Sequence, residues 1–356
     1  AGVFLSWGID PRHPLPTERG GSARSGRLPT SVMLASPLVA WEVTPTSAHP
    51  RGPIVDREGT TYLGTSVGLL AIDRSGEIAF ELPVGPVDAA PALLPDGSIF
   101  VATRDRDVAV VAPGGTVRYR VTLGSAARAS PLVLADGSIV LALLDRTLVR
   151  LRADLEPAFS IELRGGALSA PTLAASGRLA VASGAVLYLV EPETGAIVST
   201  LALGGRAIGA VARRDDGALV VLTAEGEVVV VTDESEITAR FSLGGRLYAG
   251  GALALAADGA MVVAVPSTGI VCLGPGGVVR WTFASDAPFY GVVSVDREGR
   301  VITIDRRGRL TVLDASGVLL WRMELAALEA GGVALDGERL VVATDRPSVL
   351  SLLPTP

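Results

Sequence analysis

The chain has 356 residues, of which 49% are hydrophobic and 4% aromatic, and its formal net charge is -6 at pH 7. This acidic balance gives no basic field to attract nucleic acid or anionic lipid, and we expect neither as a partner. All 31 basic residues are arginine, and lysine, asparagine and glutamine do not occur, which excludes P-loop lysines, Schiff-base lysines and N-glycosylation sequons. No apolar run approaches the roughly 20 residues of a membrane-spanning helix, so we expect no transmembrane segment.

The first predicted unit is an extended, proline-rich N-terminal segment, residues 1–36. It contains His13, and the only other histidine, His49, follows shortly after it. Neither lies near a cysteine or a cluster of acids in the sequence, and we expect both to be exposed loop residues. A Ser/His/Asp triad or a histidine-built metal site is therefore not expected.

A repeat occupies the rest of the chain. The tetrapeptide DREG occurs at Asp56–Gly59 and again at Asp296–Gly299, and related turns recur between and after these copies every 38 to 42 residues. The turn glycines of the eight units are Gly59, Gly97, Gly137, Gly177, Gly217, Gly259, Gly299 and Gly337. A period of about 40 residues is that of a β-propeller blade, so the sequence predicts an all-β protein with eight blades.

Each unit predicts four short strands. An Asp-Gly hairpin turn separates the first two strands, a loop leads to the third, and a second Asp-to-Gly turn leads to the fourth. Runs such as EVVVVT lack the apolar/polar alternation of a half-exposed strand, as expected where neighbouring blades cover both faces. A solenoid of parallel strands is the competing repeat fold, but hairpins between consecutive strands favour antiparallel blades.

The two ends of the chain predict ring closure. The eighth unit supplies only three strands, whereas the run LVAWEV at Leu38–Val43 has Trp41 where outer strands elsewhere have Trp281 and Trp321. We expect this N-terminal strand to complete the last blade, to bury Trp41, and to define a propeller over residues 37–353. Closure would remove two open sheet edges.

Turn acids and the single cysteine suggest no chemistry of their own. Side-chain oxygens two residues apart, as in DREG, DRSG and DASG, suit calcium, but these stretches recur where hairpins need turn residues, which favours turn chemistry. Cys272 lies within the predicted strand GIVCLG, where we expect a small buried hydrophobe. No metal or catalytic residue is assigned.

One charge pattern is a candidate site. Asp-Arg pairs occupy the loops between second and third strands, and single arginines occupy the connections between blades; in a propeller these loops share one face. One interpretation is that the charges satisfy one another and hold the loops, and the other is a polar docking face for a protein partner. The residues are Asp105, Arg106, Arg128, Asp145, Arg146, Arg164, Arg206, Arg246, Asp305, Arg306, Asp345 and Arg346.

The repeat unit also resembles a known family. Its Asp-Gly turn and its ending L-x-x-x-D-x-x-G-x-x-x-W, clearest in VLDASGVLLW at Val312–Trp321, resemble the PQQ-like repeat. The segment ERGGSARSG at Glu18–Gly26, preceded by Trp7, looks like the segment that introduces many propellers of this group. The resemblance extends from about Trp7 to Leu353 and implies the fold more strongly than any activity.

Two branches of that family imply different functions. Quinoprotein dehydrogenases use pyrroloquinoline quinone and calcium, with an asparagine among the metal ligands and adjacent cysteines, and this sequence has no asparagine and one cysteine. The other branch holds non-catalytic interaction propellers similar to BamB of the bacterial outer-membrane β-barrel assembly machine. The resemblance therefore implies a scaffold without a cofactor, binding protein partners in a periplasmic, secreted or cell-envelope setting. The alternative is an enzyme with a site at the channel mouth, either a degenerate quinoprotein dehydrogenase or a metal-dependent hydrolase or lyase.

Overall fold

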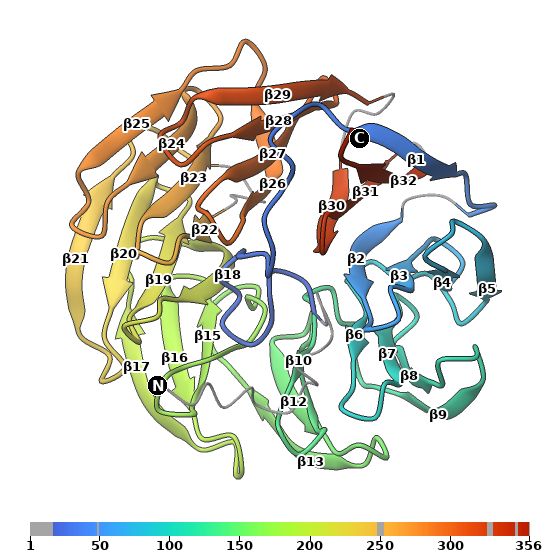
Figure 1. Cartoon of the computed structure of the whole chain (residues 1–356). Helices are drawn as coiled ribbons and strands as arrows, with labels where there is room; N and C mark the ends of the chain where they lie inside the picture. Colours follow the sequence, from blue (N-terminus) through green and yellow to red (C-terminus); the bar gives the residue numbers. More distant parts are fainter. Residues whose placement is uncertain (1–16, 48–49, 248–252, 326–329, 346–347, 356) are drawn as a thin grey trace, which may run out of the picture.

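The computed structural model describes residues 17–47, 50–247, 253–325, 330–345 and 348–355. In this part of the chain, 32 β-strands form eight four-stranded sheets whose neighbouring strands are antiparallel. Figure 1 shows the sheets arranged as blades around a central axis. The predicted eight-bladed β-propeller is confirmed. Within the described residues, no helix has the length and apolar character needed to cross a membrane.

The first four blades each follow the chain from the inner to the outer strand. Blade 1 consists of β2 (Arg51–Val55), β3 (Thr61–Gly64), β4 (Leu69–Ile72) and β5 (Ile78–Leu82). Blade 2 consists of β6 (Ala92–Leu93), β7 (Ile99–Ala102), β8 (Asp107–Val111) and β9 (Val117–Thr122). Blade 3 consists of β10 (Leu132–Val133), β11 (Ile139–Ala142), β12 (Thr147–Leu151) and β13 (Pro157–Glu162). Blade 4 consists of β14 (Thr172–Leu173), β15 (Leu179–Ser183), β16 (Val186–Val190) and β17 (Ile197–Ala202).

The remaining blades repeat this order until the last, which takes its outer strand from the other end of the chain. Blade 5 consists of β18 (Ala207–Arg213), β19 (Leu219–Thr223), β20 (Glu227–Val231) and β21 (Ile237–Ser242). Blade 6 consists of β22 (Leu253–Leu255), β23 (Met261–Val265), β24 (Gly269–Leu273) and β25 (Val279–Phe283). Blade 7 consists of β26 (Phe289–Val295), β27 (Val301–Asp305), β28 (Arg309–Leu313) and β29 (Leu319–Glu324). Blade 8 consists of β30 (Ala330–Asp336), β31 (Arg339–Thr344), β32 (Ser348–Leu353) and β1 (Leu38–Val43).

The antiparallel order gives the ring two different ends. Hairpin turns after the first and third strands, such as those ending at Gly97 and Gly115, lie at one end, which we call the turn face. Loops after the second strands and connections between blades, such as those holding Arg146 and Arg164, lie at the other end, which we call the mouth face.

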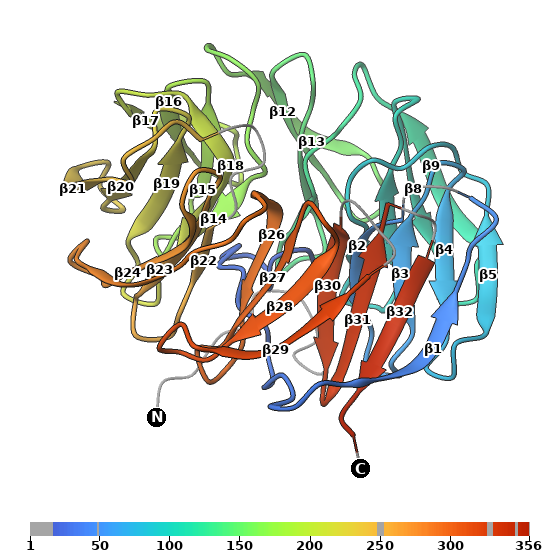
Figure 2. The same cartoon turned by 90° about the horizontal axis from the view of Figure 1, so that it is seen from above.

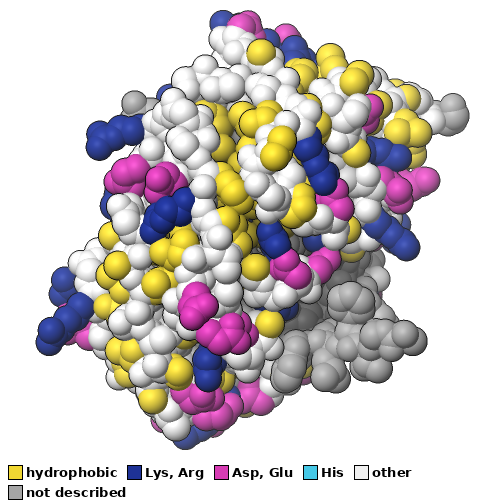
Figure 3. All heavy atoms as spheres, turned by 90° about the vertical axis from the view of Figure 1, so that its left-hand side faces the viewer, with side chains coloured by type: hydrophobic (Ala, Val, Ile, Leu, Met, Phe, Trp, Pro, Cys, Tyr) yellow, Lys and Arg dark blue, Asp and Glu magenta, His cyan; other side chains and the backbone are white. Residues whose placement is uncertain are grey.

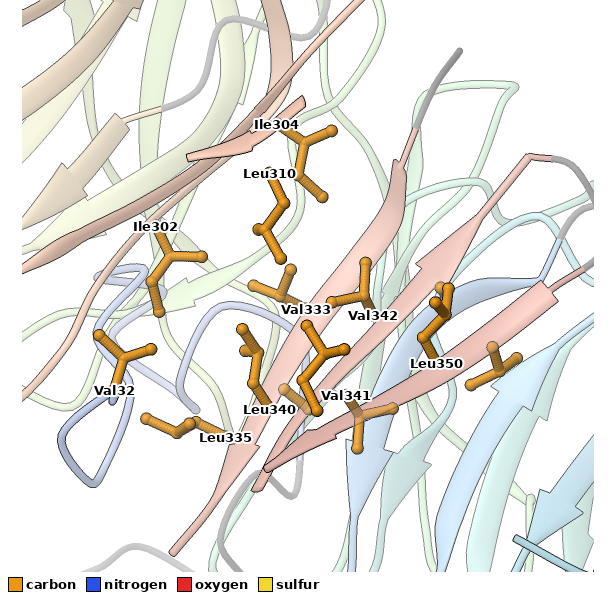
Figure 4. Close-up of a cluster of buried hydrophobic side chains, with 14 of the residues drawn as sticks. Val32, Ile302, Ile304, Leu310, Val333, Leu335, Leu340, Val341, Val342 and Leu350 are labelled. Atoms are coloured by element: carbon orange, nitrogen blue, oxygen red, sulfur yellow. The ribbon is translucent and has the colours of Figure 1, made fainter. Parts of the chain in front are cut away.

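Burial follows position within a blade, as the sequence predicts. All five residues of β19 and of β24 are buried, whereas exposure alternates along the outer strand β21. Inner strands are covered by the neighbouring blades, and their side chains form the core between blades. Figure 4 shows one such cluster, in which Ile302 and Leu310 of blade 7 meet Val333 and Leu340 of blade 8, with Val32 beside them. Cys272 is buried as expected, and burial raises the pKa of its thiol to about 11.

The ring closes as predicted. β1 pairs antiparallel with β32, with Leu38 opposite Leu353 and Val43 opposite Val349, and Figure 2 shows β30, β31, β32 and β1 side by side in that order. The expectation that Trp41 is buried is wrong. Its ring is half-buried, because β1 is an outer strand, and its Nε1 donates a hydrogen bond to a main-chain carbonyl of blade 1 (3.1 Å).

Aromatic rings on outer strands fasten several blades to the next. The ring of Trp281 lies over Gly317 of the following blade, so closely that a Cβ on this glycine would stand 2.5 Å from the indole. Gly317 has a φ of 84°, a conformation that glycine adopts without strain. Other ring-on-glycine contacts are Trp41 on Gly76, Phe80 on Gly115, Phe159 on Gly195 and Phe241 on Gly277.

The last joint uses the N-terminal segment in place of a turn. Because β32 and β1 come from opposite ends of the chain, no hairpin connects them and no turn glycine faces Trp321 of blade 7. Its Nε1 instead donates to the carbonyl of Met33 (2.8 Å), and the ring is buried. The residues before β1 therefore complete the joint as well as the blade.

Candidate docking face around the channel mouth

Loops of the mouth face are held by backbone hydrogen bonds to one another. The N–H of Leu144, in a loop after a second strand, donates to the carbonyl of Ala126 in the connection between blades 2 and 3 (2.9 Å). The N–H of Ala224 donates in the same way to the carbonyl of Arg206 (2.7 Å). The two sets of loops that the sequence assigned to one face therefore lie against each other.

The loop aspartates serve mainly to hold their own loops. Asp145 Oδ1 accepts the N–H of Thr147 (3.1 Å). Asp305 is 2% exposed, and its Oδ2 accepts Arg309 Nε (2.6 Å). Asp305 therefore does not belong to an exposed charge ring, because the third strand of its own blade covers it. Asp105 is exposed and Asp345 is half-buried.

Two of the loop arginines pair with carboxylates from neighbouring parts of the mouth face. Arg146 Nη2 donates to Glu162 (2.8 Å), and Arg128 lies 3.6 Å from Asp88. Arg106 and Arg306 are exposed. Arg346 lies outside the described residues, as do both histidines. The structure brings the described members of the set to one face.

Three arginines on successive connections between blades carry free guanidinium groups on fixed main chain. Arg164, Arg206 and Arg246 are exposed, and their guanidinium groups form no hydrogen bond or ion pair with any described residue. The main chain is nevertheless anchored at or beside each of them: the Arg164 carbonyl accepts the hydroxyl of Tyr188 (2.7 Å), and the Arg206 N–H donates to Glu225 (2.9 Å). Next to Arg246, the N–H of Leu247 donates to the carbonyl of Ala224 (3.0 Å). An arginine whose main chain is anchored and whose guanidinium is unpaired is suited to bind a carboxylate of a protein partner.

A cavity of about 490 Å³ opens on the same face beside these loops. Arg51, Arg104 and Arg128 surround Asp88 there, and Glu18 contributes to its lining. Arg104 binds Asp88 with two hydrogen bonds (2.9 and 2.6 Å). These bonds, followed by the charges of Arg104, Arg128 and Arg51, hold the pKa of Asp88 below its ordinary value. Of this group the sequence singled out only Arg128, because Asp88 and its partners lie in loops of different blades.

The channel itself is occupied by residues 17–33, which we call the channel segment. Its main chain hydrogen-bonds the innermost strands of blades 4 to 7, and Figure 1 shows the stretch before β1 near the middle of the ring. The contacts include the N–H of Leu173 to the carbonyl of Ser22 (3.0 Å) and the N–H of Leu255 to that of Ser25 (2.7 Å). A bridge between Thr17 and Ala92 adds blade 2.

Arg24 fixes the channel segment from within. Its side chain is 1% exposed and donates to the carbonyls of Pro171 (2.7 Å), Ser130 (2.6 Å) and Pro131 (2.9 Å). Burial lowers the pKa of this guanidinium to about 10, and the charge of Glu18 opposes the shift. No role for Arg24 is predicted from the sequence, although its position inside the Glu18–Gly26 motif marks it.

Turn aspartates act as the sequence predicts. Asp56 Oδ1 accepts the N–H groups of Glu58 (3.0 Å) and Thr60 (2.8 Å), which closes the DREG turn. Among the described residues, no group of three or more His, Cys, Asp or Glu side chains is placed to hold a metal ion.

Charges outside the mouth face are intermixed. Figure 3 views the side of the ring formed by outer strands such as β21 and β25, where acidic and basic side chains are interspersed among hydrophobic ones. Paired charges on this surface include Arg280 with Asp258 and Arg240 with Glu227. Isolated surface pairs of this kind contribute little to stability.

Known proteins share the architecture of this chain at low sequence identity. No protein-family model matches the sequence, and no curated protein matches it significantly. BamB from Moraxella catarrhalis is similar in structure with a TM-score of 0.73 at 15% identity, over 90% of this chain and 98% of that chain. A quinohemoprotein alcohol dehydrogenase from Comamonas testosteroni has a TM-score of 0.76 at 12% identity, over 97% of this chain and 82% of that chain.

A third similar structure is a lyase. A catalytically inactive virginiamycin B lyase from Staphylococcus aureus with quinupristin has a TM-score of 0.60 at 14% identity, over 88% of this chain and 99% of that chain. At these identities the likeness establishes the fold, which is that of PQQ-like and BamB-type propellers. Function has to be argued from the residues of this chain.

Proposed function

We propose that the chain is a non-catalytic scaffold that docks an acidic surface of a protein partner on its mouth face. The observation that carries this proposal is a set of unpaired guanidinium groups on anchored main chain, at three successive connections between blades. They belong to Arg164, Arg206 and Arg246. Rigid main chain lowers the ordering cost of binding, and each arginine can accept a carboxylate in a bidentate pair.

Occupation of the channel supports a scaffold. The channel segment crosses the centre of the ring and hydrogen-bonds its inner strands, so the mouth face is backed by the protein's own main chain. The structural likeness to BamB supports the same kind of role, and the family resemblance supports a periplasmic or cell-envelope setting. The proposal requires neither cofactor nor metal.

Charge reversal tests the docking face. In the double variant Arg206→Glu with Arg246→Glu, we expect loss of most partner capture from an envelope extract and an unchanged melting temperature. The matched control is Arg74→Glu with Arg297→Glu, which makes the same change of charge with two exposed turn-face arginines. Equal loss of capture in both variants, or a lower melting temperature in the first alone, would contradict the proposal.

The second candidate is an enzyme at the channel mouth. The observation in its favour is the cavity of about 490 Å³ with Asp88 held ionised among arginines. A quinoprotein site does not fit the residues, because the sequence has no asparagine and only one cysteine. Metal and cofactor analysis of the purified protein separates the two candidates: a stoichiometric ion or quinone would favour the enzyme, and a co-purifying protein with neither would favour the scaffold.

A further inference from the structure

Each outer strand has one residue whose side chain faces the turn of the following blade. In blade 2 this residue is Tyr119. Tyr119 lies opposite Val110, just before a register shift, as Phe80 lies opposite Ala71 and Trp281 opposite Cys272. The repeat therefore places the Tyr119 ring where other blades place the ring that covers the next turn.

The turn that faces Tyr119 has no glycine. Leu155 takes this place, with a φ of 70° and a side chain that is 3% exposed. A Cβ at the equivalent glycine of blade 2, Gly115, would stand 2.9 Å from the Phe80 ring, so a leucine cannot share the position with a docked ring. The Tyr119 side chain is correspondingly 48% exposed.

A second joint without glycine shows that this exposure is not inevitable. Ser235 has a φ of 66° at the same turn position of blade 5. The outer-strand residue facing it is Ser199, and the two hydroxyls hydrogen-bond. There a small side chain replaces the ring, and the joint closes. Between blades 2 and 3, the aromatic ring of Tyr119 is present, but the glycine that would accommodate it is replaced by Leu155.

The result is a cleft of about 830 Å³ on the turn face between blades 2 and 3. Apolar atoms of Leu94 and Val110 lie in its lining beside the exposed tyrosine ring. Its charged lining residues are Asp96, Arg118, Asp136, Arg152 and Asp154.

Most of these charges are already neutralised. Arg118 pairs with Asp96 (2.6 Å), and Asp136 pairs with the buried Arg150 (2.6 Å). Arg150 carries a second carboxylate, Glu193 (3.0 Å), so the surroundings are acidic. Arg152 keeps its positive charge, because its Nη1 donates only to a main-chain carbonyl (3.5 Å). With Asp154 included, four carboxylates and three guanidinium groups leave the cleft and its surroundings with one net negative charge.

Asp154 leaves an unpaired negative charge in the cleft. It is exposed and forms no ion pair with any described residue, and its Oδ1 accepts only the N–H of Glu156 (3.1 Å). The same cleft thus contains an exposed aromatic face and an unpaired carboxylate.

We propose that this cleft binds an arginine side chain of a partner polypeptide. A guanidinium is planar, stacks on the negative face of an aromatic ring, and meets a carboxylate with two parallel hydrogen bonds. The molecule uses the same stacking within itself, where the Arg322 guanidinium lies 5.8 Å from the centre of the Phe283 ring. The site is on the face opposite the mouth and does not depend on docking there.

Fluorine NMR provides a direct test. The chain has five tyrosines, so 3-fluorotyrosine labelling gives five signals, and Tyr119→Phe identifies the one from the cleft. The probe is the capped tripeptide Gly-Arg-Gly, with the citrulline peptide as a neutral control of the same shape and Gly-Glu-Gly as an acidic one. We expect a saturable shift of the Tyr119 signal with the arginine peptide only.

Three variants locate the site. Asp154→Asn keeps the oxygen that accepts the Glu156 N–H but removes the charge, and we expect affinity to fall at least about fivefold. Glu234→Gln, one charge removed at the equivalent turn of blade 5, should leave affinity within about twofold. Leu155→Gly lets Tyr119 dock, so the peptide shift should disappear while the other four signals stay dispersed.

The proposal has clear contrary outcomes. A Tyr119 signal that does not move with the arginine peptide, or that moves equally with the citrulline or acidic peptide, would overturn it. Unchanged affinity in Asp154→Asn would also overturn it. Should Leu155→Gly fail to fold, the Asp154→Asn and Glu234→Gln comparison decides the matter by itself.

Discussion

The turn face and the mouth face of the ring use their polar side chains differently. On the turn face, Asp314 accepts the N–H groups of Ser316 and Val318 (both 2.9 Å), so the side chain satisfies its own hairpin. On the mouth face, loops such as that of Arg206 are held through carbonyl and N–H groups of neighbouring loops. The arginines of successive connections between blades, Arg164, Arg206 and Arg246, are therefore left free for a partner on the mouth face, and on the turn face Asp154 is left unpaired beside Leu155.

Deletion of residues 37–44 should have the largest effect, because it removes β1. Without β1 the ring cannot close, and both faces depend on a closed ring. We expect loss of cooperative unfolding, since β32 would be left with an open edge and the ring would no longer be closed. Circular dichroism during thermal unfolding measures the effect. A melting curve equal to that of the full chain would contradict the closure.

Two tryptophans at equivalent positions should differ in their contribution to stability. Trp321→Ala should cost about 3 to 5 kcal/mol, because its ring is buried, and Trp41→Ala about 2 kcal/mol, because its ring is half-exposed. Chemical denaturation of both variants gives the two values. Equal losses would show that the joint of blades 7 and 8 is not special.

Loss of Arg24 should loosen the channel segment. Arg24→Ala leaves three carbonyl groups without their donor, and we expect a loss of about 2 to 3 kcal/mol in chemical denaturation. Arg24→Met, which keeps most of the volume, separates lost packing from lost hydrogen bonds. Arg206→Ala on the mouth face is the control and should stay within about 0.5 kcal/mol. A similar loss in the control would remove the distinction between structural and docking arginines.

Asp88 should give the smallest effect, and one that depends on pH. Because its folded pKa is depressed by Arg104, its contribution is complete above the ordinary aspartate pKa of about 3.9 and is lost as the pH falls through the folded value. Asp88→Asn should therefore lower the free energy of unfolding at neutral pH by less than about 1 kcal/mol. The difference should vanish in acid. A difference that grows on acidification would contradict this assignment.

Repetition explains how much of the fold the sequence predicts. Turn glycines and buried inner strands recur in every unit, so the assignment of each unit supports that of the others. The pairing of Leu38–Val43 with the C-terminal strand follows because the last unit lacks its fourth strand. The mouth-face site is predicted only as a set of charges. Burial of Asp305 depends on Arg309 across a hairpin, and Asp88 gathers arginines from several blades, which no local pattern reveals.

The channel segment shows the same limit. Arg24 is recognisable in the Glu18–Gly26 motif, but its acceptors are carbonyl groups more than 100 positions away, and any residue type supplies a carbonyl. Leu155 could be noticed only by comparing turns, once their glycines are known to lie beneath rings.

Site-specific photocross-linking in cells tests the central claim most directly. A p-benzoyl-phenylalanine placed at Arg206 reports on the mouth face, and one placed at Arg297 reports on an exposed turn of blade 7. We predict a discrete cross-linked protein partner from the first position and none from the second. A partner cross-linked from Arg297 and absent from Arg206 would contradict docking on the mouth face.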